Sequence, residues 1–466
     1  MRNDTPHVSR RRTIQDCNTP QTRAGAAFRW FQAMAIGSFP SESKLPPRRA
    51  WIVLAMLCFV YVLNFLDRQL MPILAKPIQD SLNFTDGQLG LIGGFYFAVF
   101  YTFISIPVGY LADRTSRSKV LAAACAIWSA ATASCGLAVN YMQFAVARMT
   151  VGFGEAGGVP PSYAIISDYF APGKRGLALG IFNTGPGIGA ALGVAFGASI
   201  AAAFSWRYAF LVLGGAGVFA AVAVLLVVRE PIRGGLDPVS VQATGKSGFR
   251  ETFAMFFSRK PLVLAALGAG VTQFITYGMQ NFAILFLMRE KGMTLQDVAV
   301  YYSLTALFGM TGSMVIAGWL VDRLSRRFKA AYALVPATSL VLALPLYIAY
   351  VSAPSWGVSL WFLAFTMFLN YFYLSSTVTF VQQEVRPDQR VMSGALLLLV
   401  MNFIGLGLGP TYVGAASDFF RAWSPEHSLK MAFYTCVVFY VGAIAIFFWL
   451  ARVLSRDSRE TRGTTP

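Results

Sequence analysis

A nine-residue pattern occurs twice in this chain. Residues 109–117 read GYLADRTSR and residues 318–326 read GWLVDRLSR, so both copies match G-x-L-x-D-R-x-S-R. The second copy begins almost half a chain length after the first, and each copy lies between two long apolar segments. A repeat with this spacing predicts that two similar halves form one molecule.

The apolar segments around these copies have the length of membrane spans, since a span needs about 20 predominantly apolar residues. The twelve segments that qualify are 50–75, 88–111, 118–138, 141–166, 175–203, 206–228, 261–288, 296–321, 330–350, 356–382, 391–416 and 430–454. The chain is 56% hydrophobic and 13% charged, which would leave a soluble protein with too much exposed apolar surface. We therefore predict an all-α membrane protein with about 12 transmembrane helices in two pseudo-symmetric six-helix halves.

The spans also define the organisation of the chain. The predicted regions are a disordered basic tail (1–49), the first half (50–228), a linker (229–260), the second half (261–454) and a second tail (455–466). Met34 is an alternative start of the natural protein, and a Phe-rich stretch in the linker, Phe249 to Phe257, is expected to form an interfacial helix. Several prolines fall inside spans, where membrane helices tolerate them as kinks. These are Pro72, Pro107, Pro160, Pro161, Pro186, Pro345 and Pro410.

The distribution of Lys and Arg predicts the orientation. With both termini in the cytoplasm, the cytoplasmic loops and tails carry 30 of these residues and the outer loops carry 6. Such an excess on one side is typical of inner-membrane proteins and accounts for the net charge of +17. We expect a multi-pass protein of the inner (plasma) membrane, and no nucleic-acid partner is needed to explain its charge. The polar N-terminal tail lacks the apolar segment that is typical of a signal peptide.

Enzyme chemistry has little support in the sequence. The five cysteines do not have metal-ligand spacing, and His7 and His427 lie in a tail and a predicted loop. The phosphate-binding loop of primary pumps and the nucleophile elbow of hydrolases are both missing from the sequence. We therefore expect no enzymatic activity, no cofactor and no metal, a proton gradient as the energy source, and a monomer in the lipid bilayer that binds a small-molecule substrate.

Three motifs resemble those of the major facilitator superfamily. The repeated loop at 109–117 resembles its G-x-L-x-D-R-x-G-R signature, with Ser116 in place of Gly. Arg148 to Gly152 resembles its R-x-x-x-G signature. Gly185, Pro186 and Gly189 resemble the G-P-x-x-G motif of drug:proton antiporters, with Ala190 where the family has a further Gly. The resemblance covers nearly the whole chain and implies two six-helix bundles with a substrate site between them.

Two further segments resemble the spinster family within that superfamily. They are Asn64-Phe-Leu-Asp-Arg68 in the first span and Gly152-Phe-Gly-Glu-Ala156 in the fourth. Spinster proteins are linked to sphingolipid and lysophospholipid transport, so this resemblance implies an amphiphilic or lipid-like substrate. It does not identify the substrate or the direction of transport.

Four ionisable residues lie deep within the predicted spans: Asp67, Arg68, Arg148 and Glu155. A charge at this depth is unfavourable unless it is paired or hydrated, so these residues are candidate functional groups. At 1.5 Å per residue, the first and fourth spans place Arg68, Arg148 and Glu155 in one layer. We interpret Glu155 as the proton carrier, Arg68 as its partner and as a substrate ligand, Asp67 as a further proton-coupling residue and Arg148 as a second substrate ligand. The alternative is a static ion pair that holds the two spans together.

The second half has no ionisable residue deep in a span but offers amides and hydroxyls. The proposed substrate ligands there are Gln273, Tyr277, Asn281 and Asn370, and Gln280, Tyr371, Tyr373 and Asn402 belong to the same set. This difference suggests that the first half handles protons and the second helps to shape the substrate cavity. The alternative for each aromatic residue is ordinary helix packing.

The loop motifs are candidate gates. By resemblance, Asp113 lies near the start of the eleventh span and pairs with a basic residue there, for which Arg390 is the candidate. The other proposed gating residues are Arg114, Arg117, Asp322, Arg323, Gly185, Pro186 and Gly189. A second repeat supports this interpretation, because Asp168 and Glu384 each precede a Pro-x-x-Arg sequence that ends at Arg175 or Arg390.

Three functions remain open at this stage. The first is a proton-coupled exporter or exchanger of amphiphilic, lipid-like molecules. The second is a proton-coupled uptake symporter for an organic anion, with Arg68 and Arg148 binding a carboxylate. The third is a membrane receptor that does not transport. The gate motifs in both halves argue against this function, because a receptor has no need of them.

Overall fold

The computed structural model describes residues 48–231, 249–386 and 389–463, and these residues form helices and no strand. Most of the predicted basic tail and the middle of the predicted linker lie outside this part. The helical segments of the first half are α2 (Arg48–Leu82), α3 (Asp86–Gly90), η1 (Leu91–Phe95), α4 (Tyr96–Arg114), α5 (Arg117–Leu137), α6 (Tyr141–Glu155), α7 (Val159–Tyr169), α8 (Pro172–Phe182), α9 (Gly185–Ala203) and α10 (Trp206–Val227).

The linker contributes one helix, α11 (Phe249–Ser258). The second half consists of α12 (Lys260–Lys291), α13 (Leu295–Asp297), η3 (Val298–Tyr302), α14 (Ser303–Leu307), η4 (Phe308–Gly312), α15 (Ser313–Ser325), α16 (Ala331–Ser352), α17 (Trp356–Asn370), α18 (Phe372–Glu384), α19 (Arg390–Met401), η6 (Asn402–Leu408), α20 (Gly409–Arg421), η7 (Pro425–His427) and α21 (Ser428–Gly463). Of the η segments, η7 is a 3₁₀ turn and the others are π turns. The last helix continues into residues that the sequence analysis assigned to the second tail.

The predicted all-α membrane fold is confirmed. In the described residues, 11 helical stretches are long and apolar enough to cross a membrane, and they match eleven of the predicted spans. The remaining span is interrupted, since α6 has 15 residues and α7 has 11. Large apolar side chains are exposed along the spans, among them Phe219 at 79% and Leu226 at 75% exposure. A bilayer covers such side chains, whereas water does not.

The prolines act in two ways. Pro72, Pro107 and Pro345 lie inside continuous helices. The others stand in the first turn of a helix that restarts within a span, where the missing N–H is not needed. These are Pro160 and Pro161 in α7, Pro186 in α9 and Pro410 in α20.

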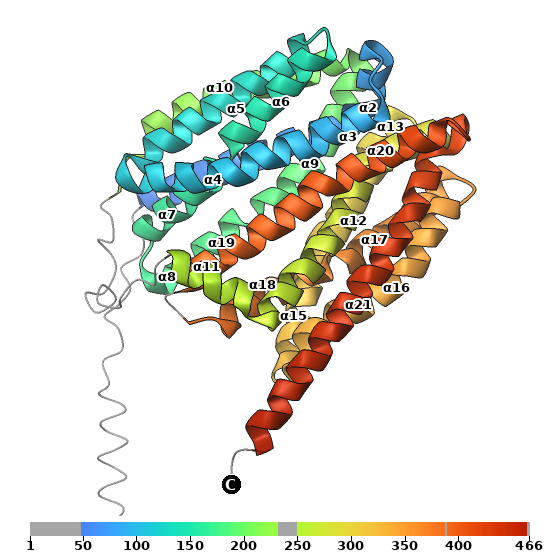
Figure 1. The fold of residues 1–466 in the computed structure, drawn as a ribbon. Helices are drawn as coiled ribbons and strands as arrows, with labels where there is room; N and C mark the ends of the chain where they lie inside the picture. The colour runs from blue at the N-terminus through green and yellow to red at the C-terminus, as the bar shows by residue number, and fades with distance from the viewer. Residues whose placement is uncertain (1–47, 232–248, 387–388, 464–466) are drawn as a thin grey trace, which may run out of the picture. The chain divides into compact units, whose positions relative to one another are not determined.

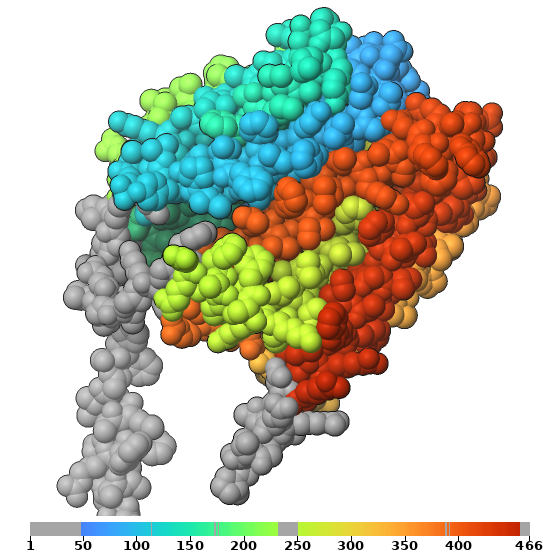
Figure 2. Space-filling view, in the orientation of Figure 1, coloured from blue at the N-terminus to red at the C-terminus, as the bar shows by residue number. Residues whose placement is uncertain are grey.

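The two halves meet along several helices. In the first half α2 packs against α9 and α5 against α10, and in the second half α12 and α16 both pack against α21. Between the halves, α3 and η1 contact α20, and α4 contacts η6. Figure 1 shows α3 and α20 side by side, and Figure 2 shows the same seam as the line where the blue first half meets the orange α20.

Equivalent ion pairs support the internal repeat. In the first half, the Arg117 guanidinium pairs with the carboxylate of Asp168 at the end of α7. In the second half, Lys329 Nζ lies 2.6 Å from a carboxylate oxygen of Glu384 at the end of α18. Each pair joins the region of the repeated motif, at its last residue in the first half and three residues beyond it in the second, to the acid that begins the second repeat. The two halves therefore share tertiary contacts as well as sequence.

Glu230 caps the helix that follows the first copy of the motif. Its carboxylate accepts hydrogen bonds from Ser116 Oγ at 2.7 Å and from the N–H groups of Ser118 and Arg117 at 3.0 and 3.1 Å. Burial raises the pKa of Glu230, but these hydrogen bonds outweigh burial and hold the pKa below its ordinary value of 4.5. The carboxylate also interacts favourably with the N-terminal end of the α5 dipole.

Replacing Glu230 with Gln is expected to lower the melting temperature at pH 7, because the charged cap is lost. The folded pKa lies below the unfolded value, so the stabilisation is complete above about pH 4.5 and disappears as the pH falls through the folded pKa. The difference in melting temperature between the two proteins should therefore vanish in acid. A difference that persists unchanged at pH 3 would contradict the charged cap.

The linker helix α11 has the amphipathic character expected from its sequence. Phe256 is fully buried, while Phe253 and Phe257 are 44% and 41% exposed. Glu251 pairs with Arg386 at 3.3 Å, and the helix packs against α12 and α19. The predicted helix over the Phe-rich stretch is confirmed, with its exposed rings available to the headgroup region of a membrane.

Candidate functional site

The structure joins two of the four buried charges in a direct ion pair. Arg68 Nε lies 2.6 Å from Glu155 Oε2, and the Glu155 side chain is fully buried. α2 carries Arg68 and α6 carries Glu155, so the pair links the first and fourth spans as the sequence analysis predicted. Within the described residues, Arg68 Nη2 and Glu155 Oε1 have no hydrogen-bond partner. The pair thus retains a free donor and a free acceptor.

The other two charges form a second pair beside the first. Arg148 Nη1 lies 3.7 Å from Asp67 Oδ2, and Thr132 Oγ1 donates a hydrogen bond of 3.0 Å to the same oxygen. Asp67 and Arg68 are neighbours on α2 and point in different directions, so Asp67 faces α5 and α6. With both acids ionised, the cluster has no net charge.

Aromatic rings surround the arginine of the first pair. The guanidinium carbon of Arg68 lies 4.5 Å from the ring centre of Tyr101, 4.9 Å from Phe65 and 5.3 Å from Phe97. Phe97 and Tyr101 stack on each other along α4. Cation–π contacts of this kind stabilise a desolvated guanidinium and fix its orientation.

A cavity lies against the two arginines. It is lined by Phe65, Arg68, Gln69, Pro72, Gly93, Phe97, Arg148, Tyr277, Gln280, Asn281, Met310 and Leu406. These residues come from α2, η1, α4 and α6 of the first half and from α12, η4 and η6 of the second. The cavity therefore lies between the halves, and both arginines face it. Glu155 and Asp67 are not among the lining residues, so the arginines stand between the acids and the cavity.

Only part of the predicted second-half set reaches this cavity. Tyr277 and Asn281 line it, and so does Gln280. Gln273 instead donates to Asn402 Oδ1 at 3.0 Å. Asn370 is buried and exchanges hydrogen bonds with the Tyr440 hydroxyl at 2.8 and 3.0 Å. The structure thus places Gln273 and Asn370 in polar contacts within the second half and outside the cavity lining.

Several lining residues carried no polar signal in the sequence. Phe65, Phe97, Met310 and Leu406 look like ordinary span residues, and Gly93 contributes bare backbone to the wall. The spacing of Phe65 to Arg68, three residues on a helix, is one signal that placed a ring beside the guanidinium. The others depend on contacts between the halves.

The fourth span is interrupted at its acid. α6 ends at Glu155, and the next turns are tightened, with Gly157 and Gly158 donating to the carbonyls of Gly154 and Glu155, both at 3.0 Å. Pro160 and Pro161 then prevent a regular continuation. Glu155 therefore stands at the C-terminal end of a helix, where the dipole disfavours a negative charge. The partner Arg68 compensates for this position.

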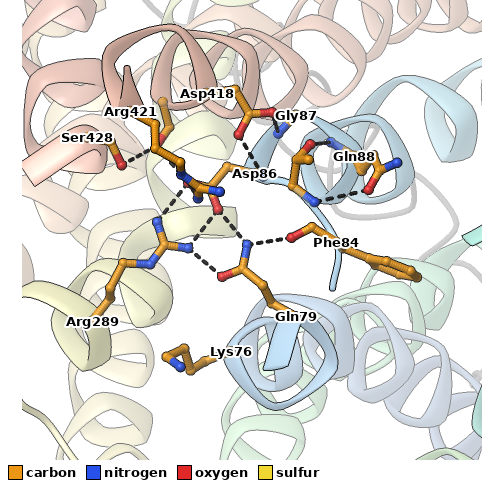
Figure 3. A network of polar contacts seen from close by, with 12 residues as sticks. Lys76, Gln79, Phe84, Asp86, Gly87, Gln88, Arg289, Asp418, Arg421 and Ser428 are labelled. Atoms are coloured by element: carbon orange, nitrogen blue, oxygen red, sulfur yellow. Dashed lines mark hydrogen bonds and ion pairs between the residues drawn. The ribbon is translucent and has the colours of Figure 1, made fainter. Parts of the chain in front are cut away.

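A second polar network joins the halves at the predicted outer end (Figure 3). The fully buried carboxylate of Asp86, the first residue of α3, accepts bonds of 2.7 Å from Nη1 and Nη2 of Arg289, and Arg421 Nη2 lies 2.9 Å away. Ser417 and Gln79 donate to the same carboxylate at 2.7 and 2.8 Å. All of these partners except Gln79 belong to the second half. The sequence analysis did not identify this network, because Asp86 and Arg289 appear as loop-side charges 203 positions apart.

A second acid strengthens this closure. Asp418 on α20 accepts hydrogen bonds from the N–H groups of Asp86 and Gly87 at 3.0 and 2.8 Å. Two N–H groups at the start of α3 in one half are therefore capped by a carboxylate from the other. The result is a closed outer end, with both Asp86 and Asp418 bridging the halves.

The predicted gate residues lie at the opposite end, and the structure describes them unevenly. The side chain of Asp113 lies outside the described residues, so its pairing with Arg390 stays a prediction. Arg114 stacks over Tyr110 at 4.2 Å, and Arg323 lies 5.6 Å from the ring centre of Trp319. The remaining charged members are Arg117 in its pair with Asp168, and Asp322 and Arg390, both on the surface.

The proline–glycine motif lies where two spans pack closely. α9 starts at Gly185, just before Pro186, and packs against α2. A Cβ atom added at Gly189 would lie 2.5 Å from the carbonyl oxygen of Val62. Only glycine permits this approach of the two backbones. The predicted close packing is present, while a gating role remains a prediction.

Comparison with known proteins agrees with this architecture. The profile of the Major Facilitator Superfamily matches residues 57–410. An MFS-type efflux pump of Mycolicibacterium smegmatis is 31% identical over 409 residues, which cover 87% of this chain and 93% of that protein. Protein spinster homolog 1 of Xenopus laevis is 24% identical over 434 residues, covering 87% of this chain and 81% of that protein.

A solved structure gives the same result. The crystal structure of a bacterial homologue of the human lysosomal transporter spinster, in an inward-facing and unoccupied conformation, has a TM-score of 0.80. It is 29% identical, and the match covers 90% of this chain and 99% of the other. These similarities indicate a multi-pass membrane transport protein with a small-molecule substrate, and not an enzyme. The chain belongs to the major facilitator superfamily and is spinster-like within it.

Proposed function

We propose that this protein is a secondary active transporter that moves a small amphiphilic or lipid-like organic molecule across the inner membrane by alternating access. Transport is coupled to protons through Glu155 and Arg68. The observation that carries this proposal is the buried Arg68–Glu155 pair, whose arginine faces a cavity between the halves. The similarity to an efflux pump and to spinster proteins supports a role in transport.

The order of groups suggests how coupling works. An anionic group that enters the cavity meets Arg68 and Arg148 before it meets either acid. Pairing with Arg68 weakens its hold on Glu155, and a buried carboxylate without a partner favours the protonated form. Because Asp67 and Glu155 belong to the same cluster of buried charges, the protonation of one acid affects that of the other. Substrate binding and proton uptake are thereby linked.

The closed outer end provides the second element of alternating access. Asp86 joins the halves there, and the crystal structure of the bacterial spinster homologue, to which this chain is similar, is inward-facing. We assign the present state to an inward-facing form. In the opposite state, Asp113 would pair with Arg390 at the cytoplasmic end. Both termini lie on that side, and the protein acts as a monomer.

The latch hypothesis has its own test. Asp113→Asn is expected to shift the population toward the inward-facing state, because the anion at the start of the eleventh span is lost. Cysteine probes placed along the cytoplasmic end of the cavity should then react faster with a water-soluble maleimide. Unchanged reactivity would rule out the latch.

An uptake symporter for an organic anion is the alternative that one observation favours. Two arginines and no acid line the cavity, and this arrangement suits a carboxylate. The two functions differ in the direction of the proton. An exporter moves protons opposite to the substrate, whereas an uptake symporter moves both together. A receptor without transport predicts no substrate-dependent proton movement at all.

The deciding experiment uses purified protein in liposomes that contain a pH-sensitive dye. Lysolipids, sphingoid bases and small carboxylates are added in turn, and proton movement is recorded. Movement opposite to an amphiphile supports the exporter, movement alongside a carboxylate supports the symporter, and no response to any of them contradicts proton coupling.

Arg68→Ala is expected to lose both substrate binding and coupling in this assay. It also leaves Glu155 buried without a partner, which costs about 3–5 kcal/mol if the carboxylate stays charged. Lys76→Ala is a suitable control, because Lys76 lies on the same helix in a partly exposed pair with Asp80. Normal substrate affinity in Arg68→Ala would show that Arg68 has only a structural role.

A further inference from the structure

The second span contains a π turn directly between the closed outer end and the cavity. η1 separates α3, which carries Asp86, from α4, which carries Phe97 and Tyr101. In this turn the N–H of Tyr96 donates to the carbonyl of Leu91, five residues earlier. A π turn contains one residue more than the α-helix would, and such turns are frequent at functional sites.

A side chain from the other half reaches into this turn. Thr411 on α20 accepts a hydrogen bond of 3.2 Å from the N–H of Phe95 through its Oγ1. The same oxygen donates to the carbonyl of Gly407 on its own chain segment at 2.8 Å, and it lies 3.3 Å from the carbonyl oxygen of Gly90. Phe95 and Gly90 are five residues apart, which is the spacing of a π-turn bond. The hydroxyl therefore contacts the backbone at both ends of the turn.

The contact requires a close approach of the two halves. A Cβ atom added at Gly94 would lie 2.8 Å from the carbonyl oxygen of Gly407 and 3.0 Å from Thr411 Oγ1. Glycine at this position lets η1 lie directly against η6 and α20. The hydroxyl of Thr411 can make its bonds to η1 only while the halves are this close, that is, while the outer end is closed.

The two sides of the π turn are held by different halves. α3 is capped by Asp418 of the second half. α4 packs on the first half, where a Cβ atom at Gly152 would lie 2.7 Å from the Phe97 carbonyl oxygen. Conversion of the π turn into a regular α-helix changes the register between α3 and α4 by one residue, which is about 100° of rotation and 1.5 Å of rise. A change at η1 therefore rotates and shifts α3, at the outer end, relative to Phe97 and Tyr101 beside Arg68.

We propose that Thr411 is a positioning residue of the transport site. Its hydroxyl holds η1 in the π form when the outer end is closed, and this register sets Gly93 and Phe97 in the cavity wall and Tyr101 against Arg68. When the outer end opens, the Thr411 hydroxyl moves away from η1, and η1 relaxes toward the α-helical register. The state of the outer end is thus transmitted to the Arg68–Glu155 pair. This inference rests on the proposed alternation between open and closed outer ends.

Hydrogen exchange tests the contact itself, on purified full-length protein in lipid nanodiscs at neutral pH. Thr411→Val removes the hydroxyl but keeps the shape, and amides in the segment 90–97 should exchange about tenfold faster, as expected for the loss of one hydrogen bond. Thr411→Ser restores the hydroxyl and should behave like the wild type. Thr338→Val is the matched control, because Thr338 Oγ1 bonds only to carbonyls of its own helix. Equal exchange in Thr411→Val and wild type would overturn the proposal.

A second measurement distinguishes positioning from mere packing. Spin labels at the exposed positions Ser81 and Glu426, in a chain without native cysteines, report the opening of the outer end as a function of pH. The pH midpoint of opening should shift in Thr411→Val and return to the wild-type value in Thr411→Ser. An unshifted midpoint in Thr411→Val would overturn the positioning role. If the wild type shows no pH response, proton coupling fails, and the exchange measurement still decides the role of Thr411.

Discussion

Replacing Glu155 with Gln is expected to reduce proton-driven flux in liposomes to the level of liposomes without protein. Glutamine has nearly the shape of glutamate and can still accept a hydrogen bond from Arg68, but it cannot take up or release a proton. The pair with Arg68, at 2.6 Å, is the only direct ion pair of that arginine among the described residues. Substrate binding should persist, because both arginines that face the cavity remain.

The control for this variant is Glu290→Gln. Glu290 is also a buried glutamate, with 2% of its side chain exposed, but it lies at the outer end, where it accepts the N–H of Lys430 at 3.1 Å. It should retain proton-driven flux. Calorimetry should show that Glu155→Gln still binds the substrate that drives proton movement in the wild type. This measurement separates loss of coupling from loss of the fold. Full flux in Glu155→Gln would remove Glu155 from the coupling mechanism.

Asp86→Asn is expected to open the outer end. The substitution keeps the shape of the side chain but removes the charge that two arginines share, and breaking a buried pair costs about 3–5 kcal/mol. At about 1.4 kcal/mol per factor of ten, the ratio of open to closed protein should rise by about two to four orders of magnitude. The distance between spin labels at Ser81 and Glu426 should lengthen accordingly. Such a protein should still bind substrate from the outer side but complete the cycle slowly.

Asp80→Asn is the matched control for this prediction. Asp80 lies six residues before Asp86 and pairs with Lys76 at 2.5 Å, but 58% of its side chain is exposed. An exposed pair contributes about 0–1 kcal/mol, so the distance distribution should stay close to that of the wild type. If both variants open the outer end equally, the buried network around Asp86 is not what closes it.

The two predictions address different parts of one cycle. The Glu155 variant tests proton uptake and release at the site. The Asp86 variant tests which contacts hold the two halves together at the outer end. Thr411 lies between them and contacts the span that carries Asp86, Phe97 and Tyr101. The double variant Glu155→Gln, Asp86→Asn should therefore respond less to pH than Asp86→Asn alone.

The sequence predicted the site best where one strong physical effect dominates. A charge inside an apolar segment is costly, so Asp67, Arg68, Arg148 and Glu155 were recognisable as a group, and the structure brings them together. The sequence analysis assigned Arg68 to Glu155, but it assigned no partner to Asp67 or to Arg148. Asp67 and Arg68 are adjacent, and only the packing of α5 and α6 around α2 directs one toward Thr132 and the other toward Glu155.

Polar residues of the second half were harder to assign. Amides and hydroxyls in membrane helices can bond to neighbouring helices, so their presence alone does not indicate a cavity. Tyr277 and Asn281 line the cavity, whereas Gln273 and Asn370 find partners in Asn402 and Tyr440. All four occur in apolar spans, and the choice between a helix partner and the cavity depends on how the helices are rotated.

The sequence by itself determined the membrane fold, the two related halves, the family and the four buried charges. Each of these follows from local hydrophobicity, from a repeated motif or from the high cost of an ion in an apolar span. The tertiary structure alone decided the closed outer end around Asp86, the wall of the cavity and the π turn that meets Thr411. These features join residues as far apart as 332 positions, and they depend on the docking of two helical bundles. No local pattern encodes that docking, because it arises from the summed shape and charge of two surfaces that form only after the spans have folded.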